Sequence, residues 1–439
     1  MRKSLVWMSV LVVIVMTALA GCGSKKSTEE SIKPEATVKE SVKTEAPQAT
    51  EAPQEEPVTL KLLHWVPYSK AALDKFHEKY PNITVQLEQV DAANYTTVLK
   101  SRLAAHADVD LIGSHPNPDE LGYAVKLNSV TELTGSTFLD NLMPAAVTAG
   151  TVDGKNYGFA QGTYAIGVWY NKDLFKKLGI AIPTNWTDFL AASEKIKQSG
   201  IAPLVISGKD GWTTGYYTLP QWTALETETP DSLAKLKTGE GKWTNPEYLA
   251  AYKQVEELVG KGYFLSGKGA LGITYDQAVQ ALQDGKAAMW IMGSWALDKF
   301  AADFKAFNVG VFPYPTNAAD KKLVVPQVTD AVISGISWSK HQDAVKKFLE
   351  FSSTTESGSL QALDQKIVST VKGATADFHP LAKEWLPLFE MAIPEPSSLI
   401  SPAVANEANA QIQKLLLGGK AEDVVKNLQE VQDKANKTK

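Results

Sequence analysis

The sequence predicts an α/β fold with mostly parallel sheets, because strand-like and helical segments alternate from the start of its folded part. Residues 58–65 and 83–90 are β-prone runs, and the segment between them, 71–80, has a helical pattern of apolar residues. A further helix is expected over 95–104 and a short strand over 109–112. Such an alternation forms a parallel sheet covered on both faces, with ligands expected beyond the carboxyl ends of the strands.

The first 21 residues have the pattern of a secretory signal peptide. Arg2 and Lys3 form a basic start, residues 5–20 are almost continuously apolar, and Leu-Ala-Gly precedes Cys22. Cys22 is the one cysteine of the chain, and its position resembles a bacterial lipobox, in which the cysteine is lipidated and becomes the mature N-terminus. We therefore expect a lipid on Cys22, rather than a free core cysteine, and no disulfide.

Residues 22–57 are predicted to form a lipidated, disordered tether. After Cys22 they contain eight Glu, five Lys and four Pro but no aromatic residue, so they cannot bury enough apolar surface to fold. Without residues 1–21 the formal net charge changes from −5 to −7, and Arg102 is the one arginine that remains. This composition does not favour nucleic acid, and it leaves almost no guanidinium clamp for phosphates or dicarboxylates.

The stretch from Tyr164 to Pro203 carries the most informative local pattern. Its apolar run 165–170 predicts a buried strand, and a short helix follows that ends at Gly179. A second helix is expected to begin at Asn185, three residues before an aspartate, and to end near Gly200. The stretch is therefore predicted to be a strand followed by two helices.

Three ordered motifs resemble one family, the family 1 extracellular solute-binding proteins. The first is YNKDLFKKLGI at 170–180, followed by a proline, by a Trp and acidic residue that open a helix, and by K-x-x-G-x-x-P. AAMWIMGSW at 287–295 comes next, and then FPYP at 312–315 with GISWSK at 335–340. The resemblance extends from about residue 58 to the C-terminus. It implies a carbohydrate-capturing subunit of an ABC importer, similar to maltose-binding protein.

The resemblance also implies a two-lobed periplasmic-binding-protein-like fold of type II, with the ligand cleft between the lobes. The chain of such proteins crosses between lobes three times. If the crossings of the resembled family are transferred to this chain, the N-terminal lobe is 58–162 plus 331–373, and the C-terminal lobe is 163–327 plus 376–439.

Aromatic residues near the predicted cleft loops are candidate platforms for a sugar, because a pyranose offers a C–H face to an indole. Three of them lie in the segment GWTTGYYTLPQW, where the spacing of the aromatic residues does not match the period of a buried helix or strand face. Trp295 lies in the GSW motif of the resembled family. Trp65 follows the first predicted strand, where packing is an equally good explanation. The aromatic candidates are Trp65, Trp212, Tyr216, Trp222 and Trp295.

Polar candidates come from strand ends and from the predicted lobe crossings, where amide and carboxylate groups could bind sugar hydroxyls. They are Asn117, Gln161, Thr163 and Asp330. Each could instead satisfy backbone groups of the hinge. His64 and His115 also lie near strand ends, and for both of them we expect a structural role.

Other classes of protein remain as alternatives. A secreted glycosidase needs two carboxylates roughly 5 to 9 Å apart, which 49 acidic residues could supply, but no G-x-S-x-G, H-E-x-x-H or phosphate-loop motif occurs. Six histidines show no close pair of ligand spacing, which disfavours a metal-binding protein. A solute-binding protein for a peptide, a polyamine or a phosphonate, or one that serves a membrane sensor, is the strongest alternative.

Our interpretation is a carbohydrate-binding component of an ABC importer, with an oligosaccharide as ligand and hinge closure as mechanism. No bond is made or broken, so no catalytic residue, cofactor or metal is expected. The expected partners are the sugar, the permease and the membrane through the lipid on Cys22, with no nucleic acid, and the protein is expected to be a monomer. The lipobox and tether favour the outer face of a Gram-positive cell membrane, with a Gram-negative cell as the alternative.

Overall fold

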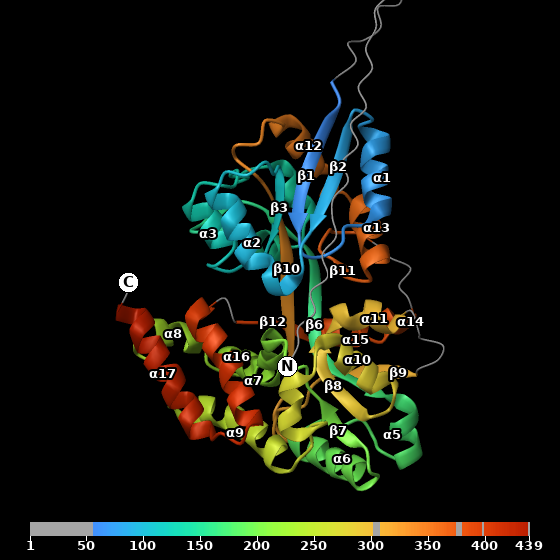
Figure 1. Ribbon diagram of the computed structural model, residues 1–439, viewed down its shortest axis with the longest axis vertical. Coiled ribbons are helices and arrows are strands. Elements are labelled where there is room, and N and C mark those ends of the chain that lie inside the picture. The colour runs from blue at the N-terminus through green and yellow to red at the C-terminus, as the bar shows by residue number, and fades with distance from the viewer. Residues whose placement is uncertain (1–55, 302–307, 375–379, 397–398, 438–439) are drawn as a thin grey trace, which may run out of the picture. The chain divides into compact units, whose positions relative to one another are not determined.

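The fold is an α/β arrangement built on one extended sheet (Figure 1). The computed structural model describes residues 56–301, 308–374, 380–396 and 399–437, so the signal peptide, Cys22 and nearly all of the tether lie outside the described residues. The hydrogen-bonded strand order is β2-β1-β3-β10-β6-β8-β7, with β9 and β11 beside β6 and β12 beside β10. The strands are β1 (Val58–His64), β2 (Ile83–Gln89), β3 (Leu111–Ser114), β6 (Phe159–Asn171), β7 (Ala202–Val205), β8 (Ala287–Gly293), β9 (Val309–Phe312), β10 (Val325–Gly335), β11 (Val368–Ser369) and β12 (Ala392–Pro394), with a separate hairpin of β4 (Thr151–Val152) and β5 (Lys155–Asn156).

The sheet is mixed, whereas the sequence predicted mostly parallel sheets. β1 pairs in parallel with β2 and β3, and β7 pairs in parallel with β8. β6 and β10 run antiparallel to each other, and β3 and β8 run antiparallel to β10 and β6 respectively. The difference arises because β6 carries the chain from one lobe to the other and β10 brings it back, so the two strands must have opposite directions.

One group of helices packs with β1, β2 and β3. It comprises α1 (Lys70–Lys79), α2 (Ala92–Ala104), α3 (Leu121–Lys126), η1 (Thr137–Asn141), α4 (Pro144–Ala149), α12 (Gln342–Ser352) and α13 (Thr355–Gln365). α1 begins at Ser69, whose hydroxyl accepts the N–H of Ala72, and its buried Phe76 meets Phe348 of α12 edge to face, with ring centroids 5.1 Å apart. Segments far apart in the sequence therefore share this core.

The remaining helices pack with the other end of β6 and with β7, β8 and β9. They are α5 (Lys172–Leu178), α6 (Trp186–Gln198), η2 (Gly211–Tyr217), α7 (Leu219–Glu228), α8 (Ser232–Thr238), α9 (Pro246–Gly260), η3 (Gly267–Gly272), α10 (Tyr275–Gln283), η4 (Ser294–Ala296), α11 (Leu297–Ala301), α14 (Pro380–Lys383), α15 (Leu386–Glu390), α16 (Pro402–Leu416) and α17 (Ala421–Lys437). Trp169 and Trp290 pair with each other across β6 and β8, and both are fully buried in the core.

The strand and two helices predicted after Tyr164 are confirmed. The Asn171 side chain accepts the N–H of Leu174 at the start of α5, and Gly179 ends that helix with a left-handed φ of 60°. Asn185 caps α6 in the same way, by accepting the N–H of Asp188 at 3.0 Å. The local sequence therefore sets both the start and the end of these elements.

The buried apolar residues fall into clusters that divide within β6 and β10. Two clusters take their residues from 60–160 and 332–371, and two others from 165–325 and 381–428. β6 and β10 contribute to clusters on both sides, so these two strands connect the two cores. The exact lobe boundaries stay a prediction. In the described ranges no helix has the length and apolar composition that crossing a membrane requires.

Candidate functional site

Five aromatic residues meet around Trp295. The Trp295 ring lies 5.5 Å from Tyr164, 5.4 Å from Tyr216 and 6.3 Å from Trp212, measured between centroids. Trp212 also stacks on Tyr275 at 5.8 Å, and as a residue it is 41% exposed. We call these five residues the aromatic cluster. It offers an exposed indole backed by further rings, which is the arrangement that a flat apolar face can stack on.

The end of β8 holds Trp295 in place. A Cβ atom at Gly293 would lie 2.1 Å from the Trp295 ring, so the indole rests directly on the backbone of that glycine. Ser294, between them, accepts the N–H of Ala165 through its hydroxyl, which ties η4 to β6. The sequence Gly-Ser-Trp therefore places an indole flat against a strand end, where a larger residue than glycine would displace it.

Two histidine rings stack on Trp65. The centroid of Trp65 lies 4.5 Å from that of His64 and 4.2 Å from that of His115, with both pairs of rings close to parallel. Tyr95 leans against the same indole at 4.9 Å. Trp65 was predicted as a sugar platform with packing as an equal alternative; these contacts show its packing, and a ligand contact by Trp65 stays a prediction.

His115 links a buried carboxylate to the crossing strand β10. Its backbone N–H and Nδ1 both lie 2.8 Å from Oε2 of Glu120, whose side chain is almost fully buried. Its Nε2 lies 3.7 Å from Oδ2 of Asp330, and the other oxygen of Asp330, Oδ1, is buried without a hydrogen-bond partner. We call Glu120, His115 and Asp330 the carboxylate–histidine triad.

The triad has perturbed pKa values. Burial lowers the pKa of His115, but Asp330 and Glu120 outweigh it and raise that pKa to about 9. Burial works against ionisation of Glu120, yet its hydrogen bonds with His115 hold its pKa below the usual value. Burial raises the pKa of Asp330, and His115 offsets part of that rise. At neutral pH the imidazolium therefore lies between two carboxyl groups.

The pKa of His64 is lowered, whereas that of His115 is raised. His64 is fully buried, and burial together with the nearby His115 lowers its pKa to about 3. Its Nδ1 accepts the N–H of Val66 at 3.0 Å, so the proton of the neutral ring is on Nε2. That Nε2 is buried and has no partner.

The other polar candidates already make hydrogen bonds within the protein. Asn117 accepts the N–H groups of Asp119 and Glu120 at 2.9 Å. Gln161 donates to the hydroxyl of Tyr68 at 2.8 Å, and Thr163 donates to the carbonyl of Val328 at 3.4 Å. These bonds are the structural alternative considered from the sequence, and a ligand contact by any of the three residues stays a prediction.

The structure does not bring Trp222 to the aromatic cluster. Trp222 is only 5% exposed and packs in the core against Trp243 and Tyr252, with ring centroids 5.3 and 6.4 Å away. The reason is that α7 turns this residue inward, although it lies in the same aromatic segment as Trp212. Sequence reasoning expected only a structural role for His115, and it did not name the three other residues that the structure brings to this site. They are Glu120, Tyr164 and Tyr275.

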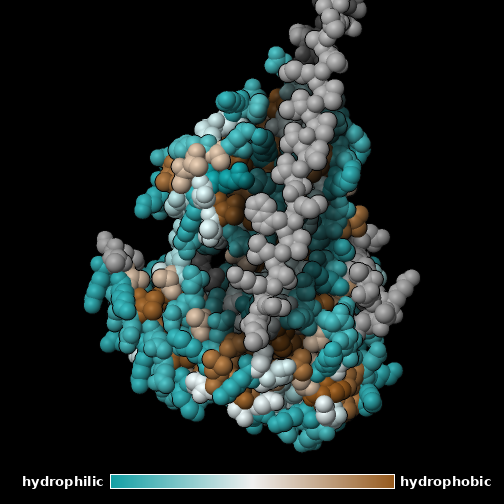
Figure 2. All heavy atoms as spheres, in the orientation of Figure 1, coloured by the Kyte–Doolittle hydropathy of each residue, from teal (hydrophilic) through white to brown (hydrophobic). Residues whose placement is uncertain are grey.

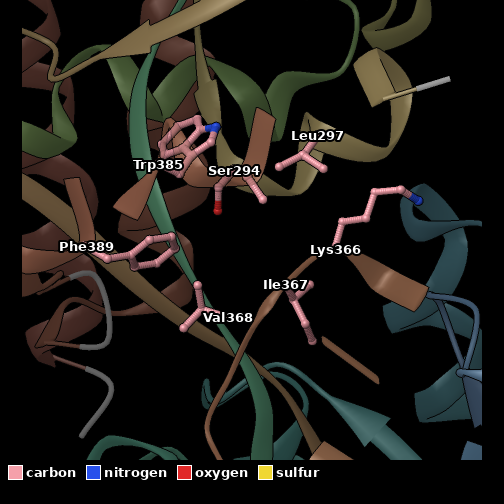
Figure 3. Close-up of a pocket in the computed structure, with 8 residues that line it drawn as sticks. Ser294, Leu297, Lys366, Ile367, Val368, Trp385 and Phe389 are labelled. Carbon is pink, nitrogen blue, oxygen red and sulfur yellow. The ribbon is translucent and has the colours of Figure 1, made fainter. Parts of the chain in front are cut away.

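A small pocket adjoins the aromatic cluster at Ser294 (Figure 3). The cavity volume is only about 10 Å³, and six of its eight lining residues are apolar. The lining residues are Ser294, Leu297, Lys366, Ile367, Val368, Ala382, Trp385 and Phe389. They come from η4 and α11 after β8, from the segment around β11, and from α14, α15 and the residue before α15; Figure 3 labels seven of them. With so few polar groups, this pocket is poorly suited to a hydroxyl-rich ligand.

The face in Figure 2 is mainly hydrophilic, with hydrophobic residues in small separate groups. Among the large hydrophobic residues that are exposed in the described ranges, Trp212 is the one that belongs to the aromatic cluster. The described residues contain no group of three or more His, Cys, Asp or Glu side chains placed to hold a metal ion.

Comparisons with known proteins agree with this architecture. A family model described as "Bacterial extracellular solute-binding protein" matches residues 66–358. The chain is 26% identical over 312 residues to the multiple sugar-binding protein of Streptococcus mutans serotype c, covering 69% of this chain and 72% of that protein.

Among solved structures, a chitin oligosaccharide binding protein matches with a TM-score of 0.75 and 25% identity, over 87% of this chain and 99% of that one. The solute-binding protein RafE in complex with raffinose matches with a TM-score of 0.72 and 20% identity, over 86% of this chain and all of RafE. These matches confirm the two-lobed fold predicted from the sequence. The chain belongs to the family of bacterial extracellular solute-binding proteins.

Proposed function

We propose that this chain captures a carbohydrate, with an oligosaccharide as its ligand, as the extracellular binding component of an ABC importer. The observation that carries the proposal is the aromatic cluster around Trp295, with the exposed indole of Trp212 at its edge. The names of the relatives support the same ligand class. Indole faces stack on the C–H faces of sugar rings, and the nearby Asp330 supplies an acceptor for hydroxyl groups.

Capture would proceed by hinge closure. β6 and β10 connect the two cores, so bending of these strands would bring the lobes together around a ligand. A ligand that first binds one lobe gains contacts with the other on closure, and this difference in affinity is what shifts the population toward the closed state. The permease would then recognise the closed form. We propose no chemical step, so the sugar should be recovered unchanged.

The proposal can be tested by calorimetric titration of the full-length protein, purified in detergent, with raffinose, xylotriose and tri-N-acetylchitotriose. A polyamine, a phosphonate and a dipeptide serve as non-sugar ligands. Trp295→Ala should weaken sugar binding, whereas Trp338→Ala should not, because Trp338 packs against His106 away from the aromatic cluster. Binding of a non-sugar ligand, with no response to any sugar, would refute the carbohydrate assignment. Mass spectrometry of the sugar after incubation would reveal any catalysis.

We also propose that the protein is a monomer held on the outer face of the cell membrane by a lipid on Cys22. The motif before Cys22 and the tether composition support this proposal. Growth with labelled palmitate should label the protein, and Cys22→Ser should abolish the label and release the protein from membranes. A Cys22→Ser protein that is still labelled and still sediments with membranes would contradict the anchor.

A further inference from the structure

We infer that His115 contacts the ligand and that His115 and Asp330 together bind two adjacent hydroxyl groups of one sugar ring, as a hydrogen-bond donor and an acceptor. This inference rests on the proposed carbohydrate function and narrows the ligand to sugars with a free pair of neighbouring hydroxyls. Of the two roles considered for Trp65, it assigns the packing role, in which the indole orients His115.

The orientation of His115 is fixed on two sides. Oε2 of Glu120 accepts from both its backbone N–H and its Nδ1 at 2.8 Å, and the ring stacks on Trp65 at 4.2 Å. With Nδ1 held in this way, Nε2 is the ring atom left to bind a ligand. The side chain of His115 is 33% exposed, so a ligand can reach it.

The donor and the acceptor lie side by side but do not satisfy each other. Nε2 of His115 lies 3.7 Å from Oδ2 of Asp330, which is longer than a hydrogen bond. Oδ1 of Asp330 is buried and has no partner. Oδ1 has almost no accessible surface, but the Asp330 side chain as a whole is 21% exposed, so we place the ligand hydroxyl on Oδ2, the oxygen beside Nε2. A second hydroxyl on the neighbouring carbon can then accept from Nε2.

The strand β10 is irregular at Ala331, the residue after Asp330. Asp330 pairs with Gly162 and Val332 pairs with Ala160, but Ala331 between them has no partner in the ladder and has a φ of 61°. A left-handed alanine costs about 1–2 kcal/mol, so the surrounding structure must hold it there. The interruption lies directly next to the carboxylate that faces His115.

His115 and Asp330 also lie next to the aromatic cluster. The charge of Asp330 contributes to raising the pKa values of Tyr164 and Tyr216, whose rings contact Trp295. A sugar ring stacked on this cluster can therefore present its hydroxyl edge to Asp330 and His115. Stacking and the two hydrogen bonds then act on the same ring.

The charge of His115 decides whether its Nε2 donates. The titratable groups that face it are Glu120, Asp330 and, across Trp65, His64. Below its pKa of about 9 both ring nitrogens carry protons, so Nε2 donates. Above that pKa the remaining proton stays on Nδ1, where Glu120 accepts it. Nε2 then becomes an acceptor facing a carboxylate, and the affinity for the sugar should fall.

The test measures sugar affinity against pH for the full-length protein in detergent, using whichever of raffinose, xylotriose and tri-N-acetylchitotriose binds. We expect wild-type affinity to fall about tenfold or more between about pH 8 and pH 10. His115→Gln, which keeps an amide donor but does not titrate, should bind more weakly at pH 7 and lose this fall. His341→Gln, which has no capping bond to lose, is the matched control and should behave as the wild type.

A second measurement does not depend on the folding of a variant. Monodeoxy analogues of the sugar that binds, each lacking one hydroxyl, should include two adjacent positions whose removal costs about tenfold in wild-type affinity. A sugar that binds equally well to the wild type and to His115→Gln, with the same pH profile, would overturn the role of His115 and leave the proposed function intact. Failure of all three sugars to bind, together with binding of a polyamine, a phosphonate or a dipeptide, would instead overturn the proposed function and this inference with it.

Discussion

His64 should make the protein less stable in weak acid. It is fully buried, and its Nδ1 accepts the N–H of Val66. Protonation would turn that acceptor into a donor facing another donor, and it would place a buried charge near the imidazolium of His115, which the negative charge of Glu120 offsets only in part. A Cβ atom at Gly113 would lie 2.2 Å from the His64 ring, so the ring has no room to move away.

The size of the effect follows from the pKa difference. The pKa of His64 is about 3 in the folded protein and about 6.5 in the unfolded chain, so the unfolded chain binds more protons between these values. Stability is therefore lost as the pH falls below about 6.5, by about 2 kcal/mol at pH 5. His115 acts in the opposite direction: its contribution is present below about pH 6.5 and is lost as the pH rises toward 9. Because a third of its side chain is exposed, we reduce that contribution to about 1–2 kcal/mol.

Urea unfolding of the full-length protein at a series of pH values, for the wild type and for His64→Asn, would measure the effect. Asparagine keeps an acceptor for the N–H of Val66 but does not titrate. Carboxylates also lose stability in acid, so the informative quantity is the difference between the two slopes. We expect His64→Asn to lose about 2 kcal/mol less than the wild type between pH 7.5 and pH 5. Parallel slopes for the two proteins would refute the reasoning.

Two further predictions use matched pairs of residues. Gly293→Ala should displace the Trp295 ring and weaken sugar binding by a few-fold to about tenfold, measured by calorimetric titration. Gly272→Ala is the control, because a Cβ atom there meets open space, and it should leave the affinity unchanged. Equal losses of affinity in the two variants would argue against the contact between Gly293 and Trp295. Asn185→Ala should lower the free energy of unfolding in urea by about 1 kcal/mol through loss of a helix cap. Asn245→Ala should have little effect because that residue makes no side-chain capping bond, and a similar loss for both would exclude capping as the cause.

The local elements were predictable because their signals are short-range. Asn171, Gly179 and Asn185 start or end helices through bonds and backbone angles that involve only a few neighbouring residues. The antiparallel direction of β10 had no such signal. It depends on the pairing of residues near 330 with residues near 160, which neither composition nor periodicity reveals.

The site was harder to predict because its members are chosen by packing in three dimensions. Trp212 and Trp222 lie in one segment with similar sequence surroundings, yet the first is exposed and the second is in the core. Tyr275 reaches the aromatic cluster only because α10 begins beside Trp212. His115 gave a weak signal, since it follows a strand end, but its importance depends on a glutamate five residues later and on Asp330.

The central position of β10 has a consequence for the order in which the protein can be completed. β3 has β10 as its second neighbour in the sheet, so the edge of β3 stays open until Val325–Gly335 has been synthesised. Pairing across such a sequence distance is slow, and an open strand edge attracts other chains. A chain that stops short of Val325 therefore has unpaired edges on both β3 and β6. The sheet can therefore be completed only after residues up to Gly335 have been synthesised.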